Sequence, residues 1–290
     1  MPTPPSPVHA PIDHYENFPV ASWLCPPRLR APIAAIYHFA RTADDIADEG
    51  DAPAARRLAD LAAYRRELHA SAAGAPPEGS RWPQVFGPLA AQVRAFGLPL
   101  PPFDDLLSAF AQDVAMTRDG AAYPDLPALL DYCRRSANPV GRLLLHLYGV
   151  RGAEALAESD AVCTALQLIN FWQDLSVDIP RGRYYLPLAD CAAHGLAITD
   201  PASRFPALRP DPETTKLIAH LASHARSTMQ KGLKIVHRVP GRAGWELRAV
   251  AQGGLRILDR IDALGPAVLA QRPALGRRDA PLILWHMLRM

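Results

Sequence analysis

The sequence predicts an all-α fold, arranged as a single-domain helical bundle around a central cavity. Apolar residues recur at spacings of three and four along most of the chain, which is the period of a helix that buries one face. No convincing run alternates with the period of two that a half-buried strand requires. Gly and Pro divide the chain into helix-sized segments, so we expect helices joined by turns.

Size and composition are those of an ordinary globular protein. The chain has 290 residues, of which 49% are hydrophobic and 21% are charged, and its net charge of +2 gives no reason to expect a nucleic-acid partner. No linker, change of composition or internal repeat divides it. We therefore predict one domain over residues 12–290, preceded by a disordered leader over residues 1–11 that contains five prolines.

The cysteines and the apolar runs bear on location. Cys25, Cys133, Cys163 and Cys191 stand far apart without a CxxC pair, and the N-terminus lacks the pattern of a signal peptide, which favours a reducing cytoplasm. Every apolar run is shorter than the roughly 18 residues expected of a membrane span. We expect a cytoplasmic protein that is soluble or lies on the inner membrane surface.

The first long helix is predicted from Arg28 to Asp48. Its apolar residues have helical spacing, and Tyr37, Arg41, Asp44 and Asp48 follow one another at intervals of four, three and four. These four side chains therefore share one side of the helix. Such a row of charged and phenolic groups indicates a functional face.

Four segments follow up to the middle of the chain, each bounded by Gly or Pro. Helices are predicted over Ala52 to Ala73, Pro83 to Phe96, Phe103 to Thr117 and Leu126 to Ser136. Asn138 to Gly141 interrupts the pattern with Pro and Gly, which indicates a kink or a helix break. Gly141 could let another group approach the backbone closely.

A second acidic segment lies on a helix predicted to begin near Ala153 and to end before Pro180. Asn170, Asp174 and Asp178 recur every four residues, so they form one stripe on that helix. The helix is apolar on nearly all of its other faces, which predicts that it is buried. Burying a carboxylate without a partner costs free energy, so this stripe needs a proton, a basic group or a cation beside it.

The C-terminal part predicts two more long helices and a tail. The helices cover Pro212 to Val236 and Gly241 to Leu264, after a Pro-rich stretch from Ala192 to Pro212 that could be a lid or simply a mobile loop. The tail from Pro281 to Met290 is apolar, and it could be a last core helix or a shallow membrane contact.

The two acidic segments together predict a magnesium site. One pair of carboxylates at this spacing is usually a solvated face, whereas two such segments held close need a proton, a basic partner or a cation. Mg²⁺ takes oxygen ligands, uses one or two carboxylates per ion and completes its shell with water and phosphate oxygens. The predicted ligands are Asp44, Asp48, Asn170, Asp174 and Asp178.

Each neighbouring basic or aromatic residue allows two interpretations. Arg41 could form a salt bridge with Asp44 or grip a phosphate, and Arg181 and Arg183 could be surface charges or phosphate ligands. Three tyrosines could pack in the core or shield a carbocation with their ring faces. They are Tyr132, Tyr184 and Tyr185.

These motifs resemble the squalene/phytoene synthase family of isoprenoid synthases, from His14 to about Ile261. The matching patterns are Tyr37-x-x-x-Arg41-x-x-Asp44-Asp45-x-x-Asp48, Tyr132-Cys133 with Pro139-Val-Gly141, Gln167-x-x-Asn170-x-x-x-Asp174-x-x-x-Asp178, and Gly182-Arg183-x-Tyr185-Leu-Pro187. Within the family, the segments Glu16 to Ser22, Arg134 to Gly141 and Asn170 to Asp174 are most similar to the hydroxysqualene synthases of the hopanoid pathway.

That resemblance implies the conversion of presqualene diphosphate and water to hydroxysqualene and diphosphate, with Mg²⁺ as cofactor. It implies catalytic roles for Tyr37, Arg41, Tyr132, Gln173 and Tyr185, and substrate contacts for His14, Asn17, Phe18, Gly141, Gln167, Arg181 and Arg183. Gln173 stands where condensing relatives usually carry Arg, and Asn17 where many carry Ser. Gln173, Tyr132 and Asn17 are the candidates for orienting the attacking water.

Two other functions fit the same motifs. The nearest is head-to-head condensation of prenyl diphosphates, giving presqualene diphosphate or phytoene. An extension of this function, the full reduction of presqualene diphosphate to squalene, is less favoured, since no Gly-rich nicotinamide fingerprint is present. The other is a non-catalytic assembly factor, which would have little reason to keep both acidic segments.

Overall fold

The computed structural model describes residues 25–75 and 78–290. The predicted leader, together with His14, Asn17 and Phe18, lies outside this range. Within it the all-α prediction is confirmed, since the regular elements are all helices and the only strand-like pairing is an isolated bridge between Ala122 and Tyr184.

The helices differ widely in length. In the first half of the chain they are α1 (Pro27–Asp48), α2 (Ala54–Ala72), α3 (Pro83–Phe96), α4 (Pro101–Asp119), α5 (Leu126–Ser136), α6 (Asn138–Tyr148) and α7 (Ala153–Gln173). The second half contains α8 (Leu175–Asp178), α9 (Leu188–Ala193), α10 (Pro201–Arg204), α11 (Pro212–Gly232), α12 (Ile235–Arg238), α13 (Arg242–Leu264) and α14 (Ala280–Arg289). Three short 3₁₀ helices are η1 (Ile179–Arg181), η2 (Gly265–Leu269) and η3 (Arg277–Asp279).

Local signals in the sequence explain where several helices begin and end. Asp125 and Asp211 cap α5 and α11, because their carboxylates accept hydrogen bonds from the N–H groups of Ala128 and Thr214 at 2.9 and 2.8 Å. Gly120 ends α4 in the left-handed conformation, with φ of 57°. The predicted bounds of α1 to α5 agree with the structure to within two residues.

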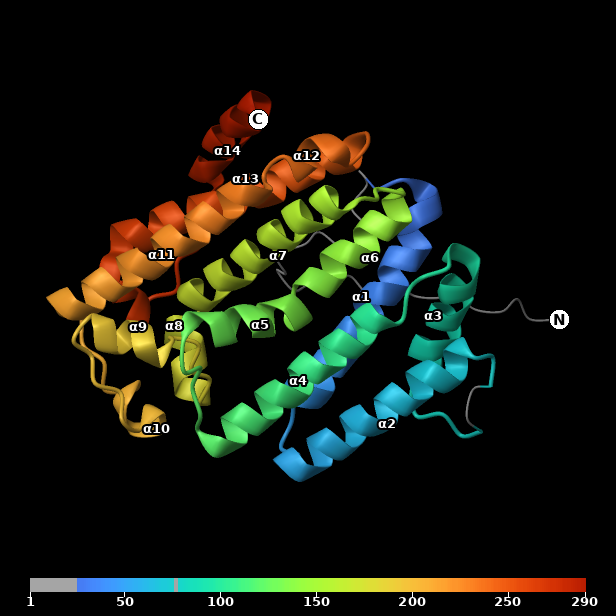
Figure 1. The fold of residues 1–290 in the computed structure, drawn as a ribbon, viewed down its shortest axis with the longest axis horizontal. Coiled ribbons are helices and arrows are strands. Elements are labelled where there is room, and N and C mark those ends of the chain that lie inside the picture. The colour runs from blue at the N-terminus through green and yellow to red at the C-terminus, as the bar shows by residue number, and fades with distance from the viewer. Residues whose placement is uncertain (1–24, 76–77) are drawn as a thin grey trace.

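Helix α7 lies at the centre of the bundle (Figure 1). It packs against α11 and α13 on one side and against α5 and α6 on the other, while α1 packs against α2, α3 and α4. Two hydrophobic clusters result, one around Phe171 and Trp172 of α7 and the other around Phe39 of α1. Helix α6 joins them, since Leu145 belongs to the first cluster and Leu143 to the second.

Close packing fixes α7 against its neighbours. A Cβ atom built on Gly232 of α11 would lie 2.4 Å from the carbonyl oxygen of Glu158, so only glycine permits this approach of the two helices. The salt bridge between Arg238 of α12 and Glu158, at 2.7 Å, holds the same end of α7.

The helix predicted from Ala153 to before Pro180 is interrupted in the structure. Asp174 leaves the helical conformation at φ −100° and ψ 14°, and α8 then begins at Leu175. The prediction of a single continuous helix was therefore wrong at this residue. Because the helix breaks at Asp174, Asn170 on α7 and Asp178 on α8 do not lie on one straight helix face.

The Pro-rich stretch before α11 is packed on the domain. Phe205 is 1% exposed, and its ring stacks on that of Tyr184 with centroids 5.1 Å apart. This anchoring argues against a mobile lid. Among the residues that the structure describes, no helix combines the length and the apolar character needed to cross a membrane.

Candidate active site

The two acidic segments face each other across a hollow, as predicted. Asp44 of α1 and Asp174 at the end of α7 line one cavity, here called the main cavity, of about 520 Å³. The guanidinium of Arg183 contacts Asp48 and lies 3.9 Å from Asp178, so a single side chain touches both segments. Segments about 130 residues apart in the sequence therefore meet in one place.

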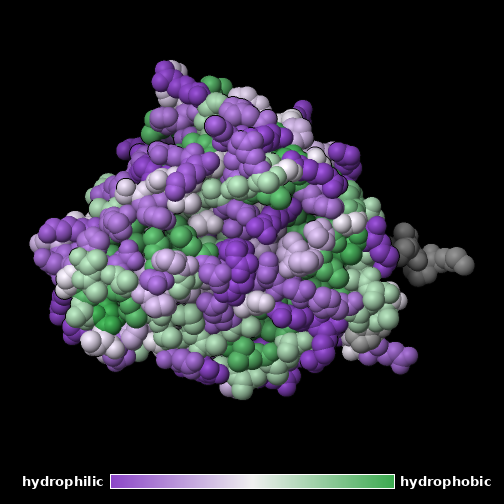
Figure 2. Space-filling view, in the orientation of Figure 1, coloured by the Kyte–Doolittle hydropathy of each residue, from purple (hydrophilic) through white to green (hydrophobic). Residues whose placement is uncertain are grey.

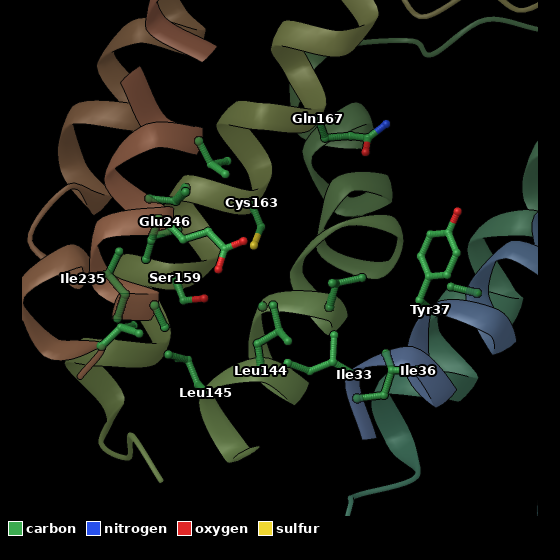
Figure 3. A pocket seen from close by; sticks show the side chains of 18 of the residues that line it. Ile33, Ile36, Tyr37, Leu144, Leu145, Ser159, Cys163, Gln167, Ile235 and Glu246 are labelled. Atoms are coloured by element: carbon green, nitrogen blue, oxygen red, sulfur yellow. The ribbon is translucent and has the colours of Figure 1, made fainter. Parts of the chain in front are cut away.

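The main cavity is polar at the end that holds these carboxylates and apolar over most of its length. One face of α7 lines it from end to end, through Ser159, Cys163, Gln167, Asn170 and Asp174. This face extends roughly 22 Å, because a helix rises about 1.5 Å per residue. The opposite walls come from α1, α6, α12 and α13 (Figure 3), and they include Ile33, Ile36, Val140, Leu144, Leu145, Ile235, Leu247 and Val250.

A second space, here called the charged hollow, lies beside the acidic end of the main cavity. Its volume is about 880 Å³, and Asp44 lines both spaces. Asp48, Asp113, Arg181 and Arg183 also line the charged hollow. A ligand with a charged group and a long apolar chain can place the first here and the second in the main cavity.

Arginines neutralise the carboxylates in the structure. Arg41 pairs with Asp44 at 2.9 Å, with Asp45 at 2.8 Å and with Glu49 at 2.5 Å, which is the salt-bridge interpretation of this residue. On the other segment, Arg272 contacts Asp174, with a second distance of 3.4 Å from Nη2 to Oδ2.

The donor set fits magnesium in its chemistry, although the carboxylates are not gathered into one cluster. Among the described residues, no three acidic, histidine or cysteine side chains lie close enough to hold one metal ion. Mg²⁺ needs only one or two carboxylates per ion, and the five predicted ligands all offer oxygen. The arginine contacts are the expected alternative, because carboxylates without a cation pair with the nearest guanidinium.

Two carboxyl groups at the site are strongly perturbed. Burial and, to a lesser extent, the neighbouring Asp174 together raise the pKa of Asp178 to about 7, while Arg181 and Arg272 oppose the shift. Burial also raises the pKa of Asp113 to about 7, against a hydrogen bond that Tyr132 donates to it. Both shifts arise mainly from burial, which disfavours the charged carboxylate, so a cation bound beside either group would favour its ionised form.

The remaining predicted residues fall into two groups. Tyr37, Gly141 and Gln167 line the main cavity, and Arg181 and Arg183 line the charged hollow. Tyr132 and Tyr185 are buried in an aromatic cluster, where Tyr185 stacks on Phe171 with centroids 3.9 Å apart. These tyrosines pack in the core, which is the first of their two interpretations, and Tyr132 contacts the charged region by donating a hydrogen bond to Asp113.

The structure does not support the role predicted for Gln173. Its side chain is 3% exposed, and its amide donates a 2.7 Å hydrogen bond to the carbonyl oxygen of Pro273. Gln173 is the last residue of α7 and faces the segment that carries Arg272. It therefore positions that arginine beside Asp174 and does not face the main cavity.

The structure shows the close approach to the backbone that was predicted at Gly141. A Cβ atom at this position would lie 2.6 Å from Cys163 Sγ and 2.6 Å from Ser159 Oγ. The group that approaches the backbone of Gly141 is thus helix α7 of the same chain. Because residue 141 is a glycine, α6 and α7 can pack closely beside the main cavity.

Three residues of the site could not be predicted from the sequence. Asp113 on α4 and Arg272 before η3 stand alone, without a motif around them. Glu246 of α13 projects a carboxylate into the otherwise apolar part of the main cavity (Figure 3). A lone acidic residue on an amphipathic helix is normally exposed, so the sequence carried no signal for this placement.

A helical bundle with two acidic segments facing across an apolar cavity defines the isoprenoid synthase class of proteins. The family described as squalene/phytoene synthase matches residues 13–279, so the chain belongs to the squalene/phytoene synthase family. The resemblance seen in the sequence motifs is thereby confirmed.

Individual relatives point to more than one activity within the family. The chain is 33% identical to a hydroxysqualene synthase of Rhodopseudomonas palustris over 258 residues, covering 87% of this chain and 82% of the relative. It is 30% identical to a presqualene diphosphate synthase of the same organism, covering 97% and 96%. The crystal structure of squalene synthase HpnC from Alicyclobacillus acidocaldarius superposes with a TM-score of 0.75 at 34% identity, covering 87% of this chain and 90% of that one.

Proposed function

We propose that this protein converts presqualene diphosphate and water to hydroxysqualene and diphosphate, with Mg²⁺, in the cytoplasm of a bacterium that makes squalene and hopanoids. The observation that carries the proposal is the main cavity, which is acidic at one end and apolar along the rest of α7. The similarity to a hydroxysqualene synthase supports the choice of substrate.

The first task of the site is to hold the diphosphate. We propose that Asp44, Asp48, Asn170, Asp174 and Asp178 hold Mg²⁺, which would neutralise the negative charge that develops on the leaving group. Arg183 and Arg272 then exchange carboxylate partners for phosphate oxygens, since guanidinium groups bind both in the same bidentate manner. Arg41 and Arg181 add positive charge at the same end.

The second task is to protect the carbocation left after the diphosphate departs. The apolar walls of the main cavity exclude bulk water, and they follow the hydrocarbon arms of the substrate along α7. Tyr37 and Tyr148 both line the cavity, and Tyr37 lies two helical turns before Asp44 on α1, so we propose that its ring faces the cation.

The third task is to place one water molecule for capture. Of the residues predicted to orient it, Asn17 lies outside the described range and Gln173 is bonded to Pro273. Tyr132 is also buried, and its hydroxyl donates a hydrogen bond to Asp113, which lines the charged hollow. Capture forms one carbon–oxygen bond and releases one proton. We propose that Tyr132 acts on the water through Asp113, whose carboxylate it positions, and not by touching the water itself.

Separate incubation with two substrates tests the proposal. Purified protein with Mg²⁺ is given either presqualene diphosphate or farnesyl diphosphate, and the extracted products are identified by gas chromatography with mass spectrometry. We expect hydroxysqualene from presqualene diphosphate and no C30 product from farnesyl diphosphate. A product formed from farnesyl diphosphate alone would overturn the assignment.

The same experiment addresses the main alternative. Similarity to a presqualene diphosphate synthase over nearly the whole chain favours head-to-head condensation as the second candidate. In that case presqualene diphosphate accumulates from farnesyl diphosphate. A protein that turns over neither substrate would support the remaining alternative, a non-catalytic assembly factor.

A further inference from the structure

The C-terminal helix α14 exposes a stripe of large apolar side chains. Leu284, Trp285 and Leu288 are 55%, 52% and 63% exposed, and their spacing of one and four places them on one side of the helix. None of the ten residues of α14 is buried, so the helix is not a core element. Contiguous exposed apolar surface of this kind marks a binding surface.

Helix α14 is held in a fixed position at the edge of the bundle (Figure 1). Asp279, just before it, accepts hydrogen bonds from Arg256 and Arg260 of α13, both at 2.7 Å. At the other end, the amide of Gln252 lies 3.0 Å from the sulfur of Met290. Helix α13 therefore holds both ends of α14, and the apolar stripe stays on the outside.

Exposed arginines stand at both ends of α14, and hydrophilic residues lie beside hydrophobic ones in this region of the surface (Figure 2). Arg277, Arg278 and Arg289 are exposed, and the chain has no acidic residue after Asp279, which is itself buried. The guanidinium of Arg289 lies 4.2 Å from the ring centroid of Trp285. Exposed tryptophan and leucine beside arginines match a membrane surface, where apolar side chains enter the acyl region and cations meet anionic headgroups.

We propose that α14 docks the protein onto a membrane surface that contains anionic lipids. The helix has ten residues, about half of what a span requires, so it would lie in the plane of the interface. A second copy of the chain is a poorer occupant, because a two-fold contact through this stripe brings Arg289 of each copy toward the other. The proposal does not depend on which diphosphate the site accepts.

The position of α14 also relates to the main cavity. Helix α13 lines that cavity through Ala243, Leu247 and Val250, and it carries α14. A bilayer bound at α14 would thus lie next to one wall of the cavity. Exposed Trp245 on α13, with Arg248 at 4.5 Å from its ring, repeats the pairing of tryptophan and arginine.

Vesicle flotation of the full-length chain tests the proposal. We expect the protein to float with vesicles of phosphatidylcholine mixed with phosphatidylglycerol, to float less with phosphatidylcholine alone, and to be released by added salt. The double variant Trp285→Gln and Leu288→Gln should lower the bound fraction roughly tenfold or more, because the apolar contact is lost. Arg289→Gln should weaken binding to the anionic vesicles alone.

The controls separate docking from folding and from self-association. Leu156→Gln changes an exposed leucine on α7 and should leave binding unchanged. Circular dichroism should show the same helical content in every variant. Equal flotation of the wild type and the double variant would overturn the proposal. So would a wild type that binds no vesicles but forms dimers that the double variant loses in analytical ultracentrifugation.

Discussion

The two acidic segments have the same spacing of oxygen-bearing side chains but sit in different environments. On α1 the carboxylates of Asp44 and Asp48 are 41% and 33% exposed. On α7 and α8 those of Asp174 and Asp178 are 17% and 11% exposed. The first segment can be screened by water, whereas the second depends on its protein partners.

The source of positive charge differs accordingly. In the first segment Asp44 is paired within its own helix by Arg41, three residues before it, whereas Asp48 is paired with Arg183 from beyond α8. The second obtains its partner from about 100 residues later in the chain, through Arg272. An exposed ion pair stabilises a protein by about 0–1 kcal/mol, and the contribution rises as the carboxylate is shielded from water, as it is more at Asp174 than at Asp44. We therefore expect the loss of a charged partner to destabilise the segment on α7 and α8 more than the segment on α1.

The largest effect should come from removing a carboxylate of either segment. Asp174→Ala and Asp44→Ala should each lower turnover at least about a thousandfold, because the leaving diphosphate then lacks a ligand for its neutralising cation. Helical content measured by circular dichroism should barely change. Asp262→Asn removes an exposed carboxylate that pairs with Arg226, and it should leave turnover intact.

Replacing one arginine partner of each acidic segment tests whether the buried carboxylate depends more on its partner than the exposed one does. Arg272→Gln should lower the melting temperature more than Arg41→Gln does, because Asp174 is the more buried carboxylate. Thermal unfolding with a chelator present measures this difference without a contribution from metal. A larger drop in melting temperature for Arg41→Gln than for Arg272→Gln would contradict this difference between the two segments.

A pair of glycine variants tests how tightly the buried side is packed. Gly141→Ala should destabilise the protein by about 1–3 kcal/mol, because the added methyl group meets Cys163 and Ser159 of α7. Gly253 lies within α13, and a Cβ atom there meets only the side chain of Leu275 at 3.7 Å, an ordinary van der Waals contact. Gly253→Ala should therefore stabilise by about 0.5–1 kcal/mol through helix propensity. Urea unfolding of both variants measures the difference.

The smallest expected effect concerns pH. The pKa of Asp113 is raised by burial to about 7, above the value near 3.9 of an unfolded chain. The folded state then holds a proton that the unfolded state loses, so stability falls as the pH rises from about 4 to about 7. Asp113→Asn should flatten this decline by a few degrees in melting temperature. An unchanged pH profile would mean that Asp113 is not the group responsible.

Much of the fold and part of the site could be predicted from the sequence. Helix bounds follow from apolar periodicity with Gly and Pro punctuation, and the meeting of the acidic segments follows from the cost of burying them alone. The break at Asp174 could not be predicted, because it depends on tertiary contacts such as the pairing with Arg272. Asp113 and Glu246 are single residues whose burial is decided by packing between distant helices.

The contact of Arg183 with both acidic segments has a mechanical consequence. This one side chain connects the end of α1 to the turn after η1. A phosphate group that bound the guanidinium of Arg183 would compete with Asp48 and Asp178 for it. Ligand binding at this rim would therefore be coupled to the distance between α1 and η1.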